Sequence, residues 1–72
     1  MTATATIDVT VNGEPRGVPA GATLLELLGL LGLDPRVVVV EHNRRIVRRP
    51  TLVDVRVSPG DAIEVVHFVG GG

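Results

Sequence analysis

Three glycines stand together at the end of the sequence, and a glycine run ahead of a free carboxylate is a feature that could do chemistry. Gly70, Gly71 and Gly72 follow an apolar segment that ends at Val69. Glycine has no Cβ, so such a tail can enter a slot only one backbone wide. Four extended residues span about 13 Å, enough to bring a terminal carboxylate into a neighbouring active site. We therefore predict that Gly72 carries the reactive group and that residues 70–72 are a flexible tail.

The composition excludes several other kinds of site. The 72 residues include no cysteine, which excludes disulfides, thiolate metal sites and a cysteine nucleophile. The two histidines, His42 and His67, give little support for a metal cluster, and we predict structural or surface roles for both. We predict no bound metal or cofactor. Four carboxylates are predicted to be solvated rather than paired in a cleft, those of Glu41, Asp54, Asp61 and Glu64.

Charge and hydropathy limit which kinds of partner and which cellular location we expect. The formal net charge is −1, which gives no general attraction to nucleic acid or to an anionic membrane. No apolar run approaches the roughly 20 residues that span a bilayer, and the first four residues do not resemble a signal peptide, so we expect a cytoplasmic protein. Three interpretations stay open for the arginine cluster, which could be a solvated hairpin, a docking site for an acidic partner or a nucleic-acid contact; its members are Arg44, Arg45, Arg48 and Arg49.

The first elements form a hairpin. Residues 5–11 alternate between apolar and polar side chains, which is typical of a half-buried strand. Asn12 and Gly13 suit a tight turn in which both residues have positive φ. A second strand should return over residues 14–18, and Pro15 places it at an edge because proline cannot donate to a ladder.

A helix is predicted over residues 23–31. Thr23 and Glu26 fit a capping box. Gly29 should mark a close approach of the helix to the sheet, and Gly32 suits a left-handed cap. Leucines repeat at helical spacing on the face expected to meet the core, namely Leu24, Leu27, Leu28 and Leu31, with Leu25 and Leu30 widening that face.

Shorter strands fill the second half. Residues 37–40 form a continuous valine run, 41–45 a polar turn, and 46–47 the start of a returning strand. Alternating valines at 53, 55 and 57 predict another strand, and residues 58–61 a type II turn around Pro59 and Gly60. The last strand should cover residues 62–69.

Together these elements predict an α+β roll. We expect a mixed sheet of four to five strands over one helix, forming a single domain over residues 1–69 with the glycine tail at 70–72. The last strand should lie centrally and parallel to the first, since the intervening helix supplies the long crossover that a parallel pair needs.

The order and spacing of these motifs resemble the ThiS family, the ubiquitin-like sulfur carriers of thiamine biosynthesis, which have a β-grasp fold. The resemblance covers essentially the whole chain, although the family commonly has proline where this chain has Arg48. The segments that carry it are Asn12-Gly13, Thr23 to Leu28, Val37 to Asn43, Ile46-Val47, Arg49, Pro59-Gly60-Asp61 and Gly71-Gly72.

The resemblance implies a carrier rather than an enzyme. A ThiF-like, E1-like adenylyltransferase would use ATP to adenylate the Gly72 carboxylate. A sulfur donor, such as a cysteine desulfurase or a rhodanese-like protein, would convert it to a thiocarboxylate, which would pass sulfur to a ThiG-like thiazole synthase. Sulfur carriage for molybdopterin synthesis or tRNA thiolation, and a ubiquitin-like tag or binding module, stay open.

One surface is a candidate for binding these partners. If Ile63 and Val65 face the helix, alternation places Glu64, Val66 and Phe68 on the opposite face of the last strand. A one-helix roll leaves that face uncovered, so Val66 and Phe68 would form a partner-binding patch. The alternative is that Phe68 is buried by a neighbouring side chain. We add Arg45 and Arg49 to the predicted partner-binding surface.

Overall fold

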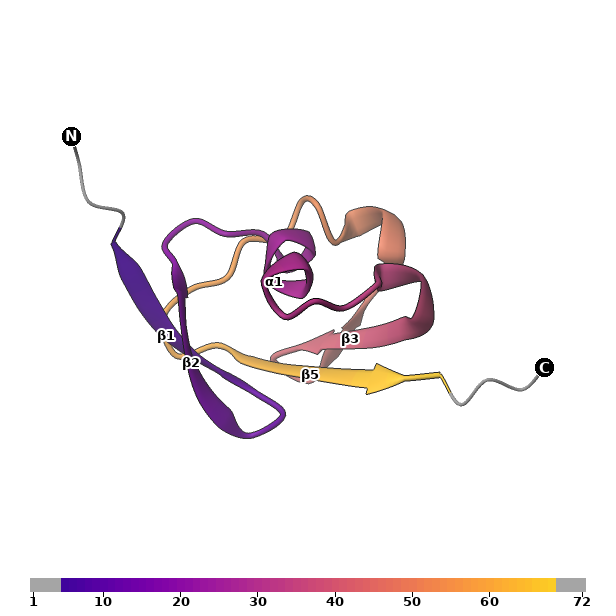
Figure 1. Ribbon diagram of the computed structural model, residues 1–72, viewed down its shortest axis with the longest axis horizontal. Coiled ribbons are helices and arrows are strands. Elements are labelled where there is room, and N and C mark those ends of the chain that lie inside the picture. Colours follow the sequence, from indigo (N-terminus) through magenta and orange to yellow (C-terminus); the bar gives the residue numbers. More distant parts are fainter. Residues whose placement is uncertain (1–4, 69–72) are drawn as a thin grey trace.

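The computed structural model describes residues 5–68 as one mixed sheet with a single α-helix on one face (Figure 1). Residues 1–4 and 69–72 lie outside this description. The spatial order of the strands is β2-β1-β5-β3-β4. In chain order the strands and the helix are β1 Thr6–Val11, β2 Glu14–Pro19, α1 Leu24–Leu30, β3 Val38–His42, β4 Arg45–Val47 and β5 Ala62–His67, with short 3-10 helices at Pro35–Val37 and Arg49–Thr51.

The last strand is central, as the sequence predicts. β5 pairs in parallel with β1, where Val11 lies opposite Ile63, and antiparallel with β3, where Val40 lies opposite Val65. Strand β2 lies at an edge, which agrees with Pro15 as its second residue. The mixed sheet over one helix confirms the predicted β-grasp architecture.

Two tight turns set the hairpins. Asn12 and Gly13 have φ values of 52° and 82° and join β1 to β2. Asn43 and Arg44, at 51° and 71°, join β3 to β4 in the same way. Positive φ at both central residues is the geometry that matches the twist of two antiparallel strands. The predicted polar turn over residues 41–45 is therefore too long, because Glu41 and His42 belong to β3.

Helix α1 is capped at both ends. The Thr23 hydroxyl accepts from the Glu26 N–H at 3.1 Å, and a Glu26 carboxylate oxygen accepts from the Thr23 N–H at 2.8 Å, which is the predicted capping box. At the other end Gly32 adopts a φ of 72°, and its N–H and that of Leu33 bond back to carbonyls of the last turn. The caps explain why so short a helix has fixed ends.

The core lies between α1 and the sheet and is aliphatic. Its side chains come from one face of the helix and the residue just before its cap, from alternate positions of β1, β3 and β5, from Val18 of β2, and from the loop before β5. The largest fully buried side chains are Leu24, Leu27, Leu28, Leu52, Ile63, Val9 and Val40.

The predicted strand over residues 53–57 is wrong. This segment is a loop around the start of α1, joined to residue 23 by an isolated bridge at Arg56. Its backbone bonds to the start of the helix, since the Val55 carbonyl accepts from the Leu24 N–H and the Val57 N–H donates to the Ala22 carbonyl. The carbonyl of Leu52, just before the segment, accepts from the Leu25 N–H. The first N–H groups of a helix have no hydrogen-bond partner within the helix. Here they bond to carbonyls of this loop region, and the segment therefore does not join the sheet as a strand.

Two details of the helix prediction also need correction. Leu25 and Leu30 do not widen the buried stripe, because they are 38% and 61% exposed. Gly29 does not mark a close approach, since a Cβ placed there would meet nothing within 4 Å. Within residues 5–68 no helix is long and apolar enough to cross a membrane.

Candidate functional site

Strand β5 carries the chain to the point where the predicted tail begins. Its last described backbone bond runs from the Phe68 N–H to the Val37 carbonyl at 2.9 Å. Because β5 lies between β1 and β3 in the strand order, Phe68 stands at the end of a central strand (Figure 1). Gly70, Gly71 and Gly72, the residues predicted to enter a partner's active site, lie outside the described residues, and their roles stay predictions.

The face of the sheet opposite α1 is open and largely apolar near this end. Val66 is 58% exposed and Phe68 is 55% exposed, so Phe68 is not a core residue. Their neighbours on the same face are Val39, which lies opposite Val66, and Ile46, which is 70% exposed. The position of Val66 and Phe68 fits the predicted binding surface, although their contact with a partner stays a prediction.

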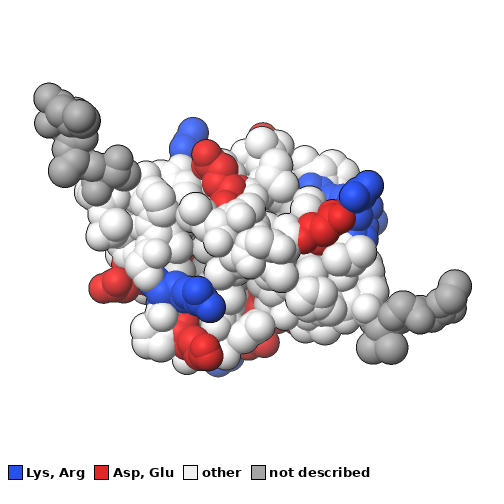
Figure 2. Space-filling view, viewed as in Figure 1, with Lys and Arg blue, Asp and Glu red and all other residues white. Residues whose placement is uncertain are grey.

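The arginine cluster does not act as one unit. Arg49 donates from Nε to the Pro35 carbonyl and from Nη2 to the Arg36 carbonyl, both at 3.2 Å, and so joins the two 3-10 helices. Arg45 is an exposed residue of β4, opposite His42. Figure 2 shows basic and acidic side chains interspersed on the face it presents. Arg49 therefore has a structural role, and partner binding by Arg45 and Arg49 stays a prediction.

Asp61 is not the solvated carboxylate that the sequence predicts. One oxygen lies 2.7 Å from His42 Nε2 and also accepts from the Ser58 N–H, and the other accepts from Asn43 Nδ2. The Asp61 side chain is 12% exposed. Burial raises the pKa of Asp61, but these hydrogen bonds and the nearby His42 outweigh it, so that the pKa lies below its usual value. The predicted structural role of His42 fits this arrangement, which joins the β3–β4 turn to the turn before β5.

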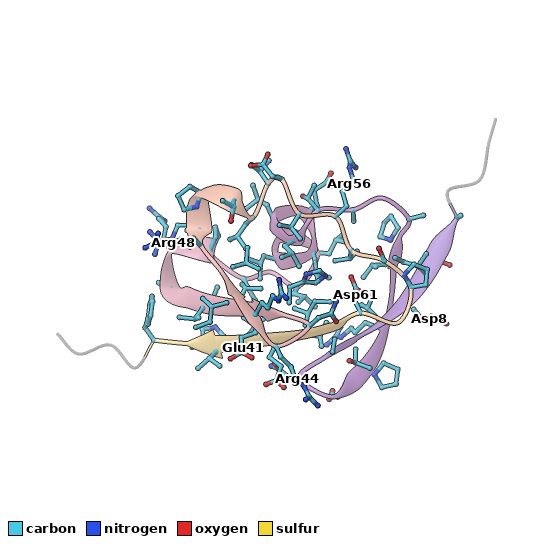
Figure 3. All side chains as sticks on the ribbon, turned by 180° about the vertical axis from the view of Figure 1, so that it is seen from behind. Asp8, Glu41, Arg44, Arg48, Arg56 and Asp61 are labelled. Atoms are coloured by element: carbon cyan, nitrogen blue, oxygen red, sulfur yellow. The ribbon has the colours of Figure 1, made fainter. Side chains whose placement is uncertain are left out.

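Two other carboxylates face each other on the open side of the sheet. Glu41 of β3 lies directly opposite Glu64 of β5. Both belong to the alternate set that points away from α1, and Figure 3 shows Glu41 on that side. Sequence analysis missed this pair, because it appears only once the register between β3 and β5 is known. Asp54, in contrast, is exposed as predicted.

A hollow lies beside Phe68, and it is lined in part by Val38 and Val39 of β3 and Ile46 and Val47 of β4. It therefore continues the apolar surface toward the end of β5. Among residues 5–68, no group of three His, Cys, Asp or Glu side chains could hold a metal ion. The described part of the chain thus presents an exposed, largely apolar surface beside the end of β5.

Comparison with known proteins decides the family. The model of the ThiS family matches residues 9–72, a span that includes nearly all of β1 through β5 and the terminal glycines. The chain belongs to the ThiS family. The resemblance predicted from the sequence is therefore confirmed.

Curated relatives include both a carrier and larger proteins. The chain is 40% identical over 50 residues to the sulfur carrier protein ThiS of Bacillus subtilis, covering 69% of this chain and 76% of that protein. It is 50% identical over 62 residues to a thiazole synthase of Magnetococcus marinus and 47% identical over 62 residues to one of Paramagnetospirillum magneticum, covering 86% of this chain in both cases. The chain spans 19% of the length of each thiazole synthase.

A solved ThiS structure has the same fold. The crystal structure of the thiamine biosynthesis protein ThiS from Geobacter metallireducens superposes with a TM-score of 0.81 at 35% identity, covering 92% of this chain and all of that one. Its solution structure gives 0.75, covering 92% of this chain and 88% of that one. The ThiS fold thus extends over essentially all the described residues.

Proposed function

We propose that this chain is a sulfur carrier for thiazole formation in thiamine biosynthesis and that the Gly72 carboxylate is the group that carries the sulfur. The observation that carries the proposal is the ThiS family match, which spans residues 9–72 and so includes Gly72. The similarity to Bacillus subtilis ThiS and to two thiazole synthases supports the same pathway.

The chemistry needs little from the chain itself. A terminal carboxylate has a pKa of about 3.3–3.7 and is ionised at neutral pH, so one of its oxygens can attack the α-phosphate of ATP and release pyrophosphate. The terminal sulfur of a persulfide on the donor protein then attacks the carbonyl carbon of the acyl-adenylate, and AMP leaves with its electron pair. A thiol cleaves the resulting acyl disulfide, which releases the thiocarboxylate and leaves the donor sulfur in a disulfide. Sulfur thereby replaces one oxygen of the terminus, which lets a chain without cysteine carry sulfur.

In this proposal the enzymes are the partners. An E1-like adenylyltransferase binds ATP and activates the terminus, a cysteine desulfurase or rhodanese-like protein supplies sulfur, and a thiazole synthase receives it. The β-grasp body presents the tail, and Val66 and Phe68 lie beside the place where the tail begins. The chain itself performs no catalytic step.

Mass spectrometry tests the proposal. The protein is incubated with its adenylyltransferase, ATP and a sulfur donor, and the intact mass should rise by the difference between sulfur and oxygen. Deleting Gly72 or adding one residue after it should abolish the change while the circular dichroism spectrum is retained. An unmodified mass in the complete reaction would overturn the proposal.

Two further outcomes of mass spectrometry would distinguish other functions from the proposed one. The proposal requires Gly72 to carry the terminal carboxylate of the mature protein, and the intact mass of the protein isolated from its own cells checks this. A longer product that continues past Gly72 would instead assign the chain to a larger protein, as in the two thiazole synthases. An isopeptide-linked adduct at Gly72 would indicate a ubiquitin-like tag.

A further inference from the structure

The open face of the sheet combines exposed apolar side chains with two opposed carboxylates. Glu41 and Glu64 are directly opposite each other on β3 and β5. Residues paired across strands have Cβ atoms about 5 Å apart, and like charges at that distance destabilise a sheet. The fold therefore keeps a repulsive pair at the centre of this face.

No ion pair within the described part of the chain compensates these two charges. Neither carboxylate takes part in an ion pair or a side-chain hydrogen bond among residues 5–68, in contrast to Asp34 and Asp61. Arg44 and Arg45 follow in the next turn and strand, yet they too form no such ion pair there. A local arrangement that costs stability without compensation within the fold points to a role in binding.

The neighbours of the pair toward the end of β5 and across β4 are apolar. Along β3 and β5 the next residues on the same face are Val39 and Val66, and across β4 the neighbour of Glu41 is Ile46. A protein that covers these apolar side chains must also cover both glutamates. Burying two carboxylates without a counter-charge is strongly unfavourable, whereas a cation placed between them would form charge-assisted hydrogen bonds in a site shielded from water.

We propose that Glu41 and Glu64 together receive one arginine or lysine side chain of the thiazole synthase, within an interface made by Val39, Ile46 and Val66. The pair then determines specificity as well as affinity. A partner that lacks the cation would bury both carboxylates without a counter-charge, and the free energy of desolvating them would weaken its binding. This inference rests on the proposed function, since it assigns a binding mode to the partner that receives the sulfur.

The test measures binding and stability on the same variants. Glu41→Gln and Glu64→Gln should each weaken binding to the thiazole synthase of the same organism by about tenfold in isothermal titration calorimetry. The double variant should also lose most of the decrease in affinity that added salt causes in the wild-type protein. Its melting temperature should equal or exceed that of the wild type, because the repulsion is removed.

Glu14→Gln is the matched control. It makes the same change of charge on β2. Glu14 lies opposite Val11, whose side chain is buried, so Glu14 is on the helix side of the sheet and not on the open face. The variant should therefore leave the affinity unchanged. Equal affinity of the double variant and the wild type would overturn the inference, as would failure of the wild-type chain to bind the thiazole synthase. A variant that loses both affinity and stability would show a structural role for the pair and would also overturn it.

The outcome is independent of the test of the proposed function. Binding through Glu41 and Glu64 without formation of a thiocarboxylate would keep this inference and reject sulfur carriage. A thiocarboxylate on the double Gln variant, together with unchanged affinity for the thiazole synthase, would support sulfur carriage and reject this inference.

Discussion

The side chain of Asn12 continues the pairing between β1 and β5 after the two backbones separate, by bonding to both backbone groups of Val65. Its Oδ1 accepts from the Val65 N–H at 2.8 Å, and its Nδ2 donates to the Val65 carbonyl at 3.2 Å. The parallel ladder itself ends two residues earlier, at Ile63. Asn12 thus holds the second half of β5 in place, just before the chain leaves the sheet.

Replacing Asn12 by glycine should destabilise the fold by about 1–3 kcal/mol, because two hydrogen bonds are lost and the Val65 backbone groups lose their partner. Glycine tolerates the φ of 52° at this position, so the change isolates the side chain. Urea denaturation measures the effect. A free energy of unfolding equal to that of the wild type would show that the side-chain bonds do not stabilise β5.

Arg44→Gly should stabilise the protein by about 0.5–1 kcal/mol. Arg44 has a φ of 71°, and a left-handed conformation costs a residue with a Cβ about 1–2 kcal/mol, more than the extra entropy of unfolded glycine. Arg48→Gly is the control, since Arg48 has a φ of −70° and glycine should only destabilise there. Thermal melts of the two variants should therefore move in opposite directions.

Asp61→Asn should cost about 1–3 kcal/mol at neutral pH, because the carboxylate accepts bonds from His42, Ser58 and Asn43. The pKa of Asp61 is lowered in the folded state, so its contribution is present above the usual value of 3.8 and is lost as the pH falls below that value through the folded pKa. Denaturation at pH 7, 5 and 3 compares the two proteins. The difference in stability should persist at pH 5 and shrink toward pH 3, whereas a constant difference would contradict the assignment.

Phe68→Ala should change stability by less than about 0.5 kcal/mol while weakening binding to the adenylyltransferase by about 1–2 kcal/mol, since more than half of the side chain is exposed. Leu52→Ala provides the contrast. Leu52 is 2% exposed, and its truncation should cost about 2–5 kcal/mol of stability. Parallel losses of binding and stability in the Phe68 variant would mean that Phe68 supports the fold.

Local chemistry made much of the fold predictable. The turn at Asn12-Gly13, the capping box of Thr23 and Glu26, and the cap at Gly32 all depend on residues within a few positions of one another, and all have the expected geometry. The order of the elements then placed β5 beside β1, because a parallel pair needs a long crossover. The predicted strand over residues 53–57 was wrong, because backbone groups of this segment bond to the start of α1. The alternation of valines in the sequence does not reveal this long-range contact.

The candidate site, too, was predictable from the sequence only in part. The sequence alone indicated the family and placed Val66 and Phe68 on the side of the last strand opposite the helix, ahead of the glycines. It left open whether Phe68 is buried, and the structure shows that Phe68 is exposed. The tertiary structure alone decided which distant side chains meet. It buried Asp61 against His42 and set Glu41 opposite Glu64, because cross-strand register and loop packing depend on how the whole chain closes and not on any local pattern of residues.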